Sequence, residues 1–160
     1  LWMARVRLDN NKNRRSAMLV SQILKNKAEG VLTVSPGATL REVVEVLTNK
    51  RIGAVVVSKD GKDIKGIISE RDIVRELCRS GAVCLDEKVE KVMTRAVLGC
   101  SPADNTDTVL GTMTSKRFRH MPVMDGNEMV GFISIGDVVA ARLSELQMEK
   151  DALTGMIMGN

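Results

Sequence analysis

The chain has 160 residues, of which 44% are hydrophobic, yet it contains only two Phe, one Trp and no Tyr. This composition is typical of one compact domain with a core of aliphatic and Met side chains, and it excludes a disordered chain. Residues 1–19 carry five basic groups and one acidic group, so the net charge of +4 arises there and residues 20–160 are neutral overall. A neutral body without aromatic platforms argues against nucleic-acid binding.

No stretch approaches the roughly 18 consecutive apolar residues that a membrane span needs. Residues 1–19 also lack the apolar segment of a secretory signal. Cys78, Cys84 and Cys100 are not paired at the short spacings of a zinc site, and His120, the single histidine, has no cluster of possible metal ligands around it. We therefore expect a cytoplasmic protein with reduced thiols, no metal and no catalytic cofactor.

The first half of the chain predicts a helix, a strand, a helix, two strands and a helix. Thr39 and Glu42 have the spacing of a capping box and open the clearest helix, whose apolar residues share one face. Asp60-Gly61 is a hairpin signal between two β-branched runs. The predicted ranges are a helix over 17–24 ended by Glu29-Gly30, a strand over 31–34, a helix from 39, strands over 54–57 and 64–68, and a helix over 69–79.

The second half predicts the same order of elements. Asp125-Gly126 marks its hairpin, and the closing helix is longer than its counterpart in the first half. The predicted ranges are an opening segment over 89–93, a strand over 97–100, a helix over 105–115, hairpin strands over 120–124 and 128–134, and a helix from 135. We expect a basic segment at 1–19, one repeat at 20–80, a linker at 81–88, a second repeat at 89–143 and a helical extension at 144–160.

These halves are copies of one unit. Gly66–Val74 and Gly131–Val139 both read as an apolar strand that enters a helix, with Ser and Asp three residues apart at the junction. Upstream, Asn49–Ile52 corresponds to Ser115–Phe118, and Val34–Pro36 corresponds to Cys100–Pro102. A duplicated unit of this length indicates two halves that share one core.

The two junctions are the strongest candidates for a binding site. A helix N-terminus offers free N–H groups and a positive dipole end to a phosphate, and the hydroxyl of Ser69 or Ser134 adds a donor. The carboxylate of Asp72 or Asp137 is able to accept hydrogen bonds from both hydroxyls of a ribose. Ser followed three residues later by an acidic residue is also ordinary capping chemistry, but its occurrence in both copies favours the functional interpretation.

These motifs resemble those of a tandem pair of CBS domains, the modules named for cystathionine β-synthase. The resemblance covers roughly Val20–Leu143. It rests on the Gly-x-x-Ser-x-x-Asp pattern in both copies, on Val34, Pro36 and Thr39, and on Arg119–Val123. It implies an α+β fold in which two β-α-β-β-α repeats pack sheet to sheet about a pseudo-two-fold axis and leave two clefts for AMP, ADP, ATP or NAD.

The resemblance also assigns roles residue by residue. Asp72 and Asp137 correspond to ribose-binding carboxylates, and Ser69 and Ser134 to hydroxyls near the phosphate. The remaining residues carried over are Thr33, Ser35 and Ser101 at the base pocket, Ala54, Val55, Met121 and Pro122 on the pocket strands, and Arg119 and His120 facing the phosphates, with Arg71 as a further candidate. Where the family favours Thr as a helix cap, this chain has Asn105.

Structural interpretations of some of these residues remain open at this level. Arg119 and His120 also fit a solvent-exposed strand edge, and Arg71 also fits an ion pair with Glu70 or Asp72. Met121, like the other methionines, also fits core packing, as does Cys100.

We therefore expect a regulatory sensor that binds an adenine nucleotide, does not catalyse a reaction, forms a homodimer and acts on a regulated protein encoded as a separate chain. The alternatives are a nucleotide-processing enzyme that uses Asp72, Asp137 or His120, and an interaction scaffold that uses the long last helix. Apolar Leu143, Leu146, Leu153, Met156 and Ile157 predict one apolar stripe on that helix, to be buried by the body of the protein or by a second subunit.

Overall fold

A computed structural model of the chain describes residues 18–27 and 30–159. Apart from Met18 and Leu19, the basic segment predicted at 1–19 lies outside the described residues, as do Ala17 and Glu29. The elements are α1 (Val20–Asn26), β1 (Thr33–Val34), α2 (Leu40–Lys50), β2 (Ala54–Ser58), β3 (Ile64–Ser69), α3 (Glu70–Ser80), the 3-10 helices η1 (Ala82–Asp86) and η2 (Val89–Lys91), α4 (Thr106–Lys116), β4 (His120–Asp125), β5 (Glu128–Ser134) and α5 (Ile135–Met158).

The first repeat forms a three-stranded sheet in the order β1-β2-β3. β1 is parallel to β2, and β2 is antiparallel to β3, with Ala54 opposite Ser69 at the end of the hairpin that leads into α3. The predicted capping box opens α2, because Thr39 Oγ1 accepts the Glu42 N–H and the Glu42 carboxylate accepts the Thr39 N–H. The helices α2 and α3 pack with η1 on the buried side chains of β2 and β3.

The second repeat has only the β4-β5 hairpin as regular sheet. The strand predicted over 97–100 does not form: Cys100 makes one isolated parallel bridge with Val123. The Cys100 N–H donates to the Pro122 carbonyl, and the Met124 N–H donates to the Cys100 carbonyl. The next step of the ladder would need an N–H from residue 122, which proline does not have. Pro122 therefore ends the pairing after a single residue.

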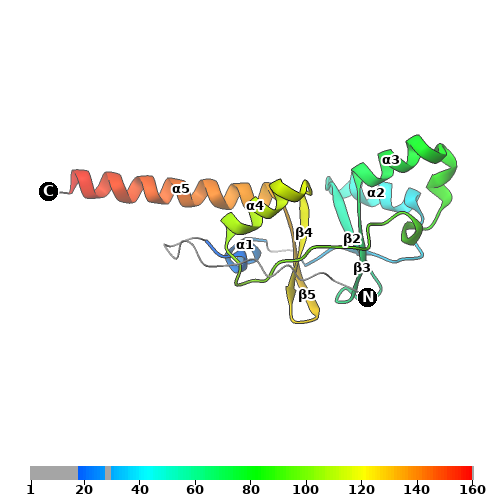
Figure 1. The fold of residues 1–160 in the computed structure, drawn as a ribbon, viewed down its shortest axis with the longest axis horizontal. Coiled ribbons are helices and arrows are strands. Elements are labelled where there is room, and N and C mark those ends of the chain that lie inside the picture. Colours follow the sequence, from blue (N-terminus) through cyan, green and yellow to red (C-terminus); the bar gives the residue numbers. More distant parts are fainter. Residues whose placement is uncertain (1–17, 28–29, 160) are drawn as a thin grey trace.

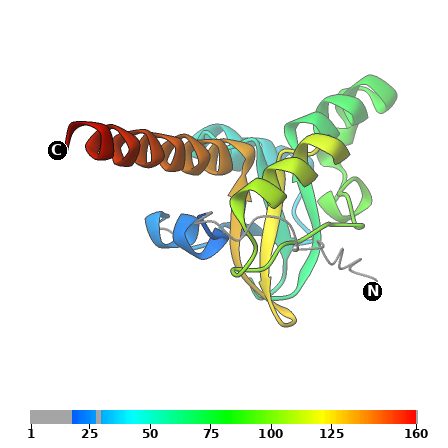
Figure 2. The same cartoon turned by 60° about the vertical axis from the view of Figure 1, so that its left-hand side comes forward.

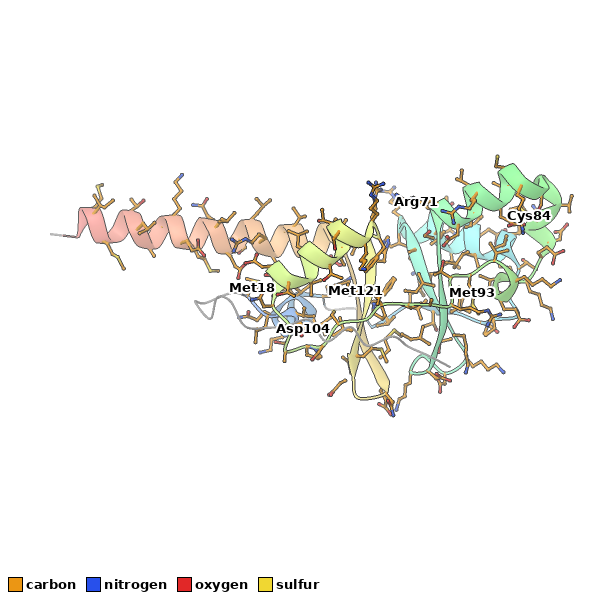
Figure 3. All side chains as sticks on the ribbon, viewed as in Figure 1. Met18, Arg71, Cys84, Met93, Asp104 and Met121 are labelled. Atoms are coloured by element: carbon orange, nitrogen blue, oxygen red, sulfur yellow. The ribbon has the colours of Figure 1, made fainter. Side chains whose placement is uncertain are left out.

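The short helices that precede each repeat in the sequence pack on the other repeat. Val20 and Ile23 of α1, which precedes the first repeat in sequence, lie in the core of the second repeat with Val109, Met113 and Met121. Conversely, η1 and η2, which follow the first repeat, contribute Cys84 and Val89 to its core. Figure 3 labels Cys84 and Met93, whose side chains lie in the core of the first repeat, and Met121, which lies in the core of the second. The methionines in these cores fill space, as their interpretation as packing residues predicted.

The two hairpins pack face to face, with both turns pointing in the same direction (Figures 1 and 2). Val56 and Ile67 of the first repeat share a buried cluster with Met124 and Met129 of the second. The two-repeat α+β fold expected about a pseudo-two-fold axis is thereby confirmed. Asn105 proves an effective cap for α4, because its side chain accepts the Thr108 N–H at 3.1 Å.

The last helix, α5, leaves the body and projects beyond it (Figure 1). Its attachment is polar as well as apolar: Glu145 is only 6% exposed, and its carboxylate accepts hydrogen bonds from the Met18 N–H and the Thr106 hydroxyl and pairs with Arg142. From residue 146 to residue 159 every side chain is exposed. Within the described ranges, no helix combines the length and the apolar character needed to cross a membrane.

The signature glycines occupy two tight contacts. The segment after η2 bridges to β3, where Ile67 and Thr94 exchange backbone hydrogen bonds of 2.9 and 2.8 Å. A Cβ on Gly66 would lie 2.7 Å from the Thr94 carbonyl oxygen. At the corresponding position, a Cβ on Gly131 would lie 2.4 Å from Leu24 Cδ2. The obstacle at Gly66 is backbone, whereas that at Gly131 is the end of a side chain.

We expect Gly66→Ala to lower the free energy of unfolding by about 1–3 kcal/mol, because β3 and the Thr94 segment that bridges to it must move apart. Gly131→Ala should cost less, because the Leu24 side chain is able to change rotamer. Urea denaturation of both variants measures the two losses. A larger loss for Gly131→Ala would contradict this account.

Candidate functional site

The first candidate junction joins β3 to α3. Ser69 is the N-cap of α3, and its Oγ accepts the Asp72 N–H at 3.3 Å. In return Asp72 Oδ2 accepts the Ser69 N–H and the Ser69 hydroxyl, each at 2.9 Å. The other oxygen, Oδ1, lies 3.7 Å from Arg75 Nη1. The Asp72 carboxylate is thus oriented by the helix that it caps, and its second oxygen faces the Arg75 guanidinium group.

The second junction, between β5 and α5, repeats this geometry with an added ion pair. Asp137 Oδ2 accepts the Ser134 N–H at 2.8 Å and lies 2.9 Å from Lys27 Nζ, which also donates to the Phe132 carbonyl. Burial alone would raise the pKa of Asp137, but the hydrogen bonds from Ser134 and Lys27 outweigh it and hold that pKa below its ordinary value. The ionised form therefore stabilises the fold above a pH of about 4, and this contribution is lost as the pH falls through the lowered pKa.

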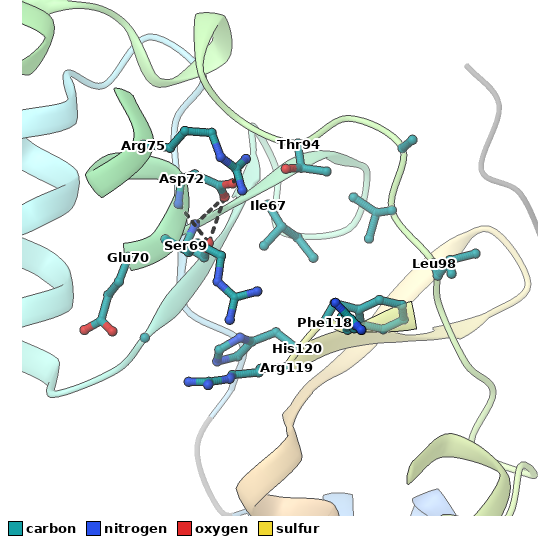
Figure 4. A pocket seen from close by; sticks show the side chains of 15 residues that line it. Ile67, Ser69, Glu70, Asp72, Arg75, Thr94, Leu98, Phe118, Arg119 and His120 are labelled. Atoms are coloured by element: carbon teal, nitrogen blue, oxygen red, sulfur yellow. Dashed lines mark hydrogen bonds and ion pairs between the residues drawn. The ribbon is translucent and has the colours of Figure 1, made fainter. Parts of the chain in front are cut away.

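A cleft of about 410 Å³ opens beside Ser69 and Asp72, and we call it the Asp72 cleft. Figure 4 shows Ser69 and Asp72 on one side, with Phe118, Arg119 and His120 of the second repeat facing them. Thr94 and the segment up to Leu98 form a third side. Four guanidinium groups (Arg71, Arg75, Arg117 and Arg119) and two carboxylates (Glu70 and Asp72) line it.

A second cleft of about 710 Å³ opens beside Ser134 and Asp137, and we call it the Asp137 cleft. The first repeat contributes Arg51, Gly53 and Ala54 to it, in the positions that Arg117, Arg119 and His120 occupy in the other cleft. Val31 and Leu32 form an apolar side, as Val97 and Leu98 do in the Asp72 cleft. Each cleft therefore combines the helix N-terminus of one repeat with the helix C-terminus of the other.

The structure brings together most of the polar residues predicted for the site. Ser69, Arg71, Asp72, Arg119 and His120 line the Asp72 cleft. The Asp137 cleft is lined by Ala54, His120, Ser134 and Asp137. Arg71 lines its cleft while Arg75, one turn further along α3, makes the ion pair with Asp72.

The other predicted residues lie outside both sets of lining residues. Val55 and Met121 are each 1% exposed and belong to the cores of their repeats, and Pro122 is also buried. Thr33 lies on β1, Ser35 faces a separate shallow depression beside α2, and the Ser101 N–H donates to Asp104 in a turn. The segments that line the clefts come a few residues earlier, at Gly30–Leu32 and Thr94–Leu98.

Sequence reasoning missed five basic residues of the clefts: Lys27, Lys50 and Arg51 of the Asp137 cleft, and Arg75 and Arg117 of the Asp72 cleft. Arg51 and Arg117 follow α2 and α4 in the left-handed conformation, with φ of 54° and 58°. A non-glycine residue at such a φ is uncommon, and here it turns the chain from the helix toward the cleft. The sequence pattern that indicates Arg51 and Arg117 is the Lys-Arg pair that occurs in both copies, at 50–51 and at 116–117. Lys27 has no counterpart in the repeat pattern, so only the fold reveals its contact with Asp137.

The clefts have the chemistry of an anion and polyol site. N–H groups at a helix N-terminus and guanidinium groups bind phosphate oxygens, whereas a fixed carboxylate oxygen accepts hydroxyl groups. Residues 18–27 and 30–159 contain no group of three or more His, Cys, Asp or Glu side chains placed to hold a metal ion. Burial raises the pKa of the Cys100 thiol to about 12, with a smaller effect of Asp104, which supports its interpretation as a packing residue.

We expect Asp72→Ala to lower the free energy of unfolding by about 1 kcal/mol, because the Ser69 N–H then loses its partner at the start of α3. Asp72→Asn should cost less, since the amide keeps an oxygen acceptor. Glu70→Ala, also in the first turn, is the control because its carboxylate makes no ion pair with the described residues. Chemical denaturation measures all three, and an equal loss for Glu70→Ala would contradict a capping role of Asp72.

Known proteins share both the sequence pattern and the fold. The CBS domain family matches residues 20–79 and 89–144. The chain is 32% identical to the mitochondrial CBS domain-containing protein CBSX3 of Arabidopsis thaliana over 148 residues, which cover 88% of this chain and 72% of that protein.

Two solved structures share the fold, and one of them was solved with AMP. A CBS-domain containing protein from Agrobacterium tumefaciens is 39% identical, with a TM-score of 0.75 over 78% of this chain and 99% of that one. A CBS domain protein from Pyrobaculum aerophilum, solved in complex with AMP, is 25% identical, with a TM-score of 0.66 over 75% of this chain and 89% of that one. With both repeats matched and the fold shared, this chain belongs to the CBS domain family.

Proposed function

We propose that this chain is a regulatory sensor that binds an adenine nucleotide, AMP, ADP, ATP or NAD, in the Asp72 and Asp137 clefts. The observation that carries the proposal is the pairing, in each cleft, of a carboxylate fixed by its helix cap with an arginine from the opposite repeat. The AMP complex of the protein from Pyrobaculum aerophilum supports the choice of an adenine nucleotide.

The parts of a nucleotide have matching surfaces in each cleft. Val97 and Leu98, or Val31 and Leu32, offer an apolar side to a base. Oδ1 of Asp137, and Oδ1 of Asp72 in competition with Arg75, accepts the ribose hydroxyls. In the Asp72 cleft Arg71, Arg117 and Arg119 attract the phosphate together with the positive dipole end of α3.

The clefts are chemically unequal, and the difference supports unequal affinities. In the Asp137 cleft Lys27 lies 2.9 Å from the carboxylate, closer than the 3.7 Å between Arg75 and Asp72, and Gly53 takes the position that Arg119 has in the other repeat. A ligand there must compete with, or recruit, the Lys27 ammonium group. We infer that the Asp72 cleft binds phosphate more strongly.

A regulatory function fits the groups in the clefts better than catalysis does. His120 is the only imidazole of the chain, and both carboxylates are held as helix caps. The enzyme alternative requires one of these groups to act as a general base. The regulated protein would be recognised by a nucleotide-dependent change in the clefts.

We expect Asp72→Asn and Asp137→Asn each to weaken AMP binding at its own cleft by about tenfold or more, since a charged acceptor of ribose hydroxyls is worth roughly 1.5–3 kcal/mol. Arg119→Gln should weaken AMP binding more than adenosine binding, because only AMP carries a phosphate. Isothermal titration calorimetry measures these affinities, with Asp125→Asn at the exposed hairpin turn as the control.

The same titration separates the alternatives. Unchanged AMP affinity in both Asp→Asn variants would refute the site. Consumption of the nucleotide would instead support the enzyme, and absence of binding would support the scaffold.

We also propose that α5 joins two copies of the chain in a homodimer. Val139, Leu143, Leu146, Leu153 and Ile157 follow one another at steps of four, three, seven and four, which is the spacing of a coiled-coil seam. Leu143, Leu153 and Ile157 are 62%, 61% and 79% exposed. Lys150 occupies the remaining seam position, where a single polar residue selects pairing geometry at a cost in stability. The body of the protein packs on the opposite face, through Val138, Ala141 and Glu145.

We expect Leu153→Glu together with Ile157→Glu to convert the dimer to a monomer, because both charges would be buried in the seam. These substitutions spare the buried Glu145, which a deletion of the helix would remove. Met148→Glu with Ala152→Glu, on the opposite face, is the matched control. Light scattering measures the mass, and a monomeric wild type or a double variant that remains dimeric would refute the seam.

A further inference from the structure

The imidazole of His120 is a wall of both clefts. Among the described residues that line the Asp72 and Asp137 clefts, only Gly53 and His120 are common to the two. His120 opens β4 opposite Ser134, the cap residue of the Asp137 cleft. From the same position it faces Ser69 and Glu70 across the Asp72 cleft (Figure 4). One side chain therefore borders both sites.

His120 is able to border both clefts because the first repeat has a small residue at the equivalent position. Ala54 pairs with Ser69 as His120 pairs with Ser134, so Ala54 and His120 are equivalent in the two copies. A Cβ on Gly53 would already lie 3.5 Å from His120 Cε1 and 3.6 Å from the Glu70 carboxylate. A large side chain in the first repeat would thus compete for this space, and the small Gly53 and Ala54 leave it to a single imidazole.

The ring is held in place and surrounded by charges of both signs. It stacks on Phe132 with the ring centroids 5.6 Å apart. Burial lowers the pKa of His120 and is the largest effect. The carboxylates of Asp137 from α5 and Glu70 from α3 raise this pKa by smaller amounts, and the cations of Lys27 and Arg119 lower it. The ring is therefore neutral at pH 7 and has room to gain a proton when a phosphate anion comes near.

We propose that His120 couples the two clefts: a phosphate in either cleft draws one proton from solvent onto the imidazole, and the charged ring then strengthens phosphate binding in the other. The free energy needed to protonate the partly buried ring reduces the affinity of the first ligand, whereas the second ligand binds to a ring that is already charged. Binding in one cleft consequently raises the affinity of the other, and the effect is reciprocal. This coupling rests on the proposed nucleotide site.

The lone histidine gives the test a direct reporter, because the imidazole signals in an NMR spectrum of the full chain belong to His120 alone. We would titrate pH from 5 to 8.5 without ligand, with AMP and with adenosine. The same titration of Asp72→Asn and Asp137→Asn, each with one cleft weakened, reports on the other cleft. AMP should raise the midpoint of the His120 titration in the wild type and in both variants, whereas adenosine should not.

Calorimetry then measures the coupling itself. In the wild type at pH 7.5 we expect AMP in one cleft to raise the affinity of the other by about fivefold, the lower end of usual coupling strengths. His120→Gln, which has no titratable ring, should bind AMP at two independent sites. Arg117→Gln, in the Asp72 cleft only, should weaken binding there and keep the coupling.

The outcomes separate this inference from the proposed function. If AMP fails to bind the wild type, the proposed function and the coupling both fall. If AMP binds both clefts while the His120 midpoint responds in only one of the Asp→Asn variants, the shared role is refuted. Coupling that persists in His120→Gln, or two independent clefts in the wild type, refutes it equally.

Discussion

The clefts depend on the contact between the two hairpins, where Val56 and Ile67 meet Met124 and Met129 in one buried cluster. Each hairpin ends at a helix N-terminus and is preceded by a helix C-terminus. When the two sheets pack about the pseudo-two-fold axis, the N-terminus of one repeat faces the C-terminus of the other. Neither repeat alone has a cleft, because the carboxylate and the opposing arginine come from different copies.

Exchange of the flanking segments strengthens this contact. The helix α1 packs on the second repeat, and Thr94, in the segment after η2, bridges to β3 of the first. The same connections supply the apolar sides of the clefts, at Val31 and Leu32 and at Val97 and Leu98. Side chains that pack in the core and side chains that line the clefts thus lie on the same short segments. A substitution that alters the packing of these segments therefore also alters the shape of the clefts.

Asp72 and Asp137 serve two purposes, and this links stability to binding. In each, Oδ2 accepts the N–H of the cap serine, which leaves Oδ1 outside the cap. A capping carboxylate is already ionised, oriented and partly desolvated before a ligand arrives, which reduces the entropy lost on binding. Divergence of the copies then sets the difference between the clefts, because Arg119 lines the Asp72 cleft and only Ala54 of the small pair Gly53 and Ala54 is specific to the Asp137 cleft.

Local signals in the sequence were sufficient to predict the duplication, the principal helices, both hairpins and the two Ser-x-x-Asp junctions, because capping boxes, hairpin turns and periodic apolar residues each depend on neighbouring residues. The sequence also identified Arg71, Arg119 and His120 as cleft residues, through the family resemblance. Tertiary structure decided what local signals do not contain: that Pro122 stops the strand predicted over 97–100, that Lys27 reaches Asp137 across 110 positions, and that His120 borders both clefts. Each of these depends on which segments the packing of the two repeats brings together, and no spacing along the chain records that.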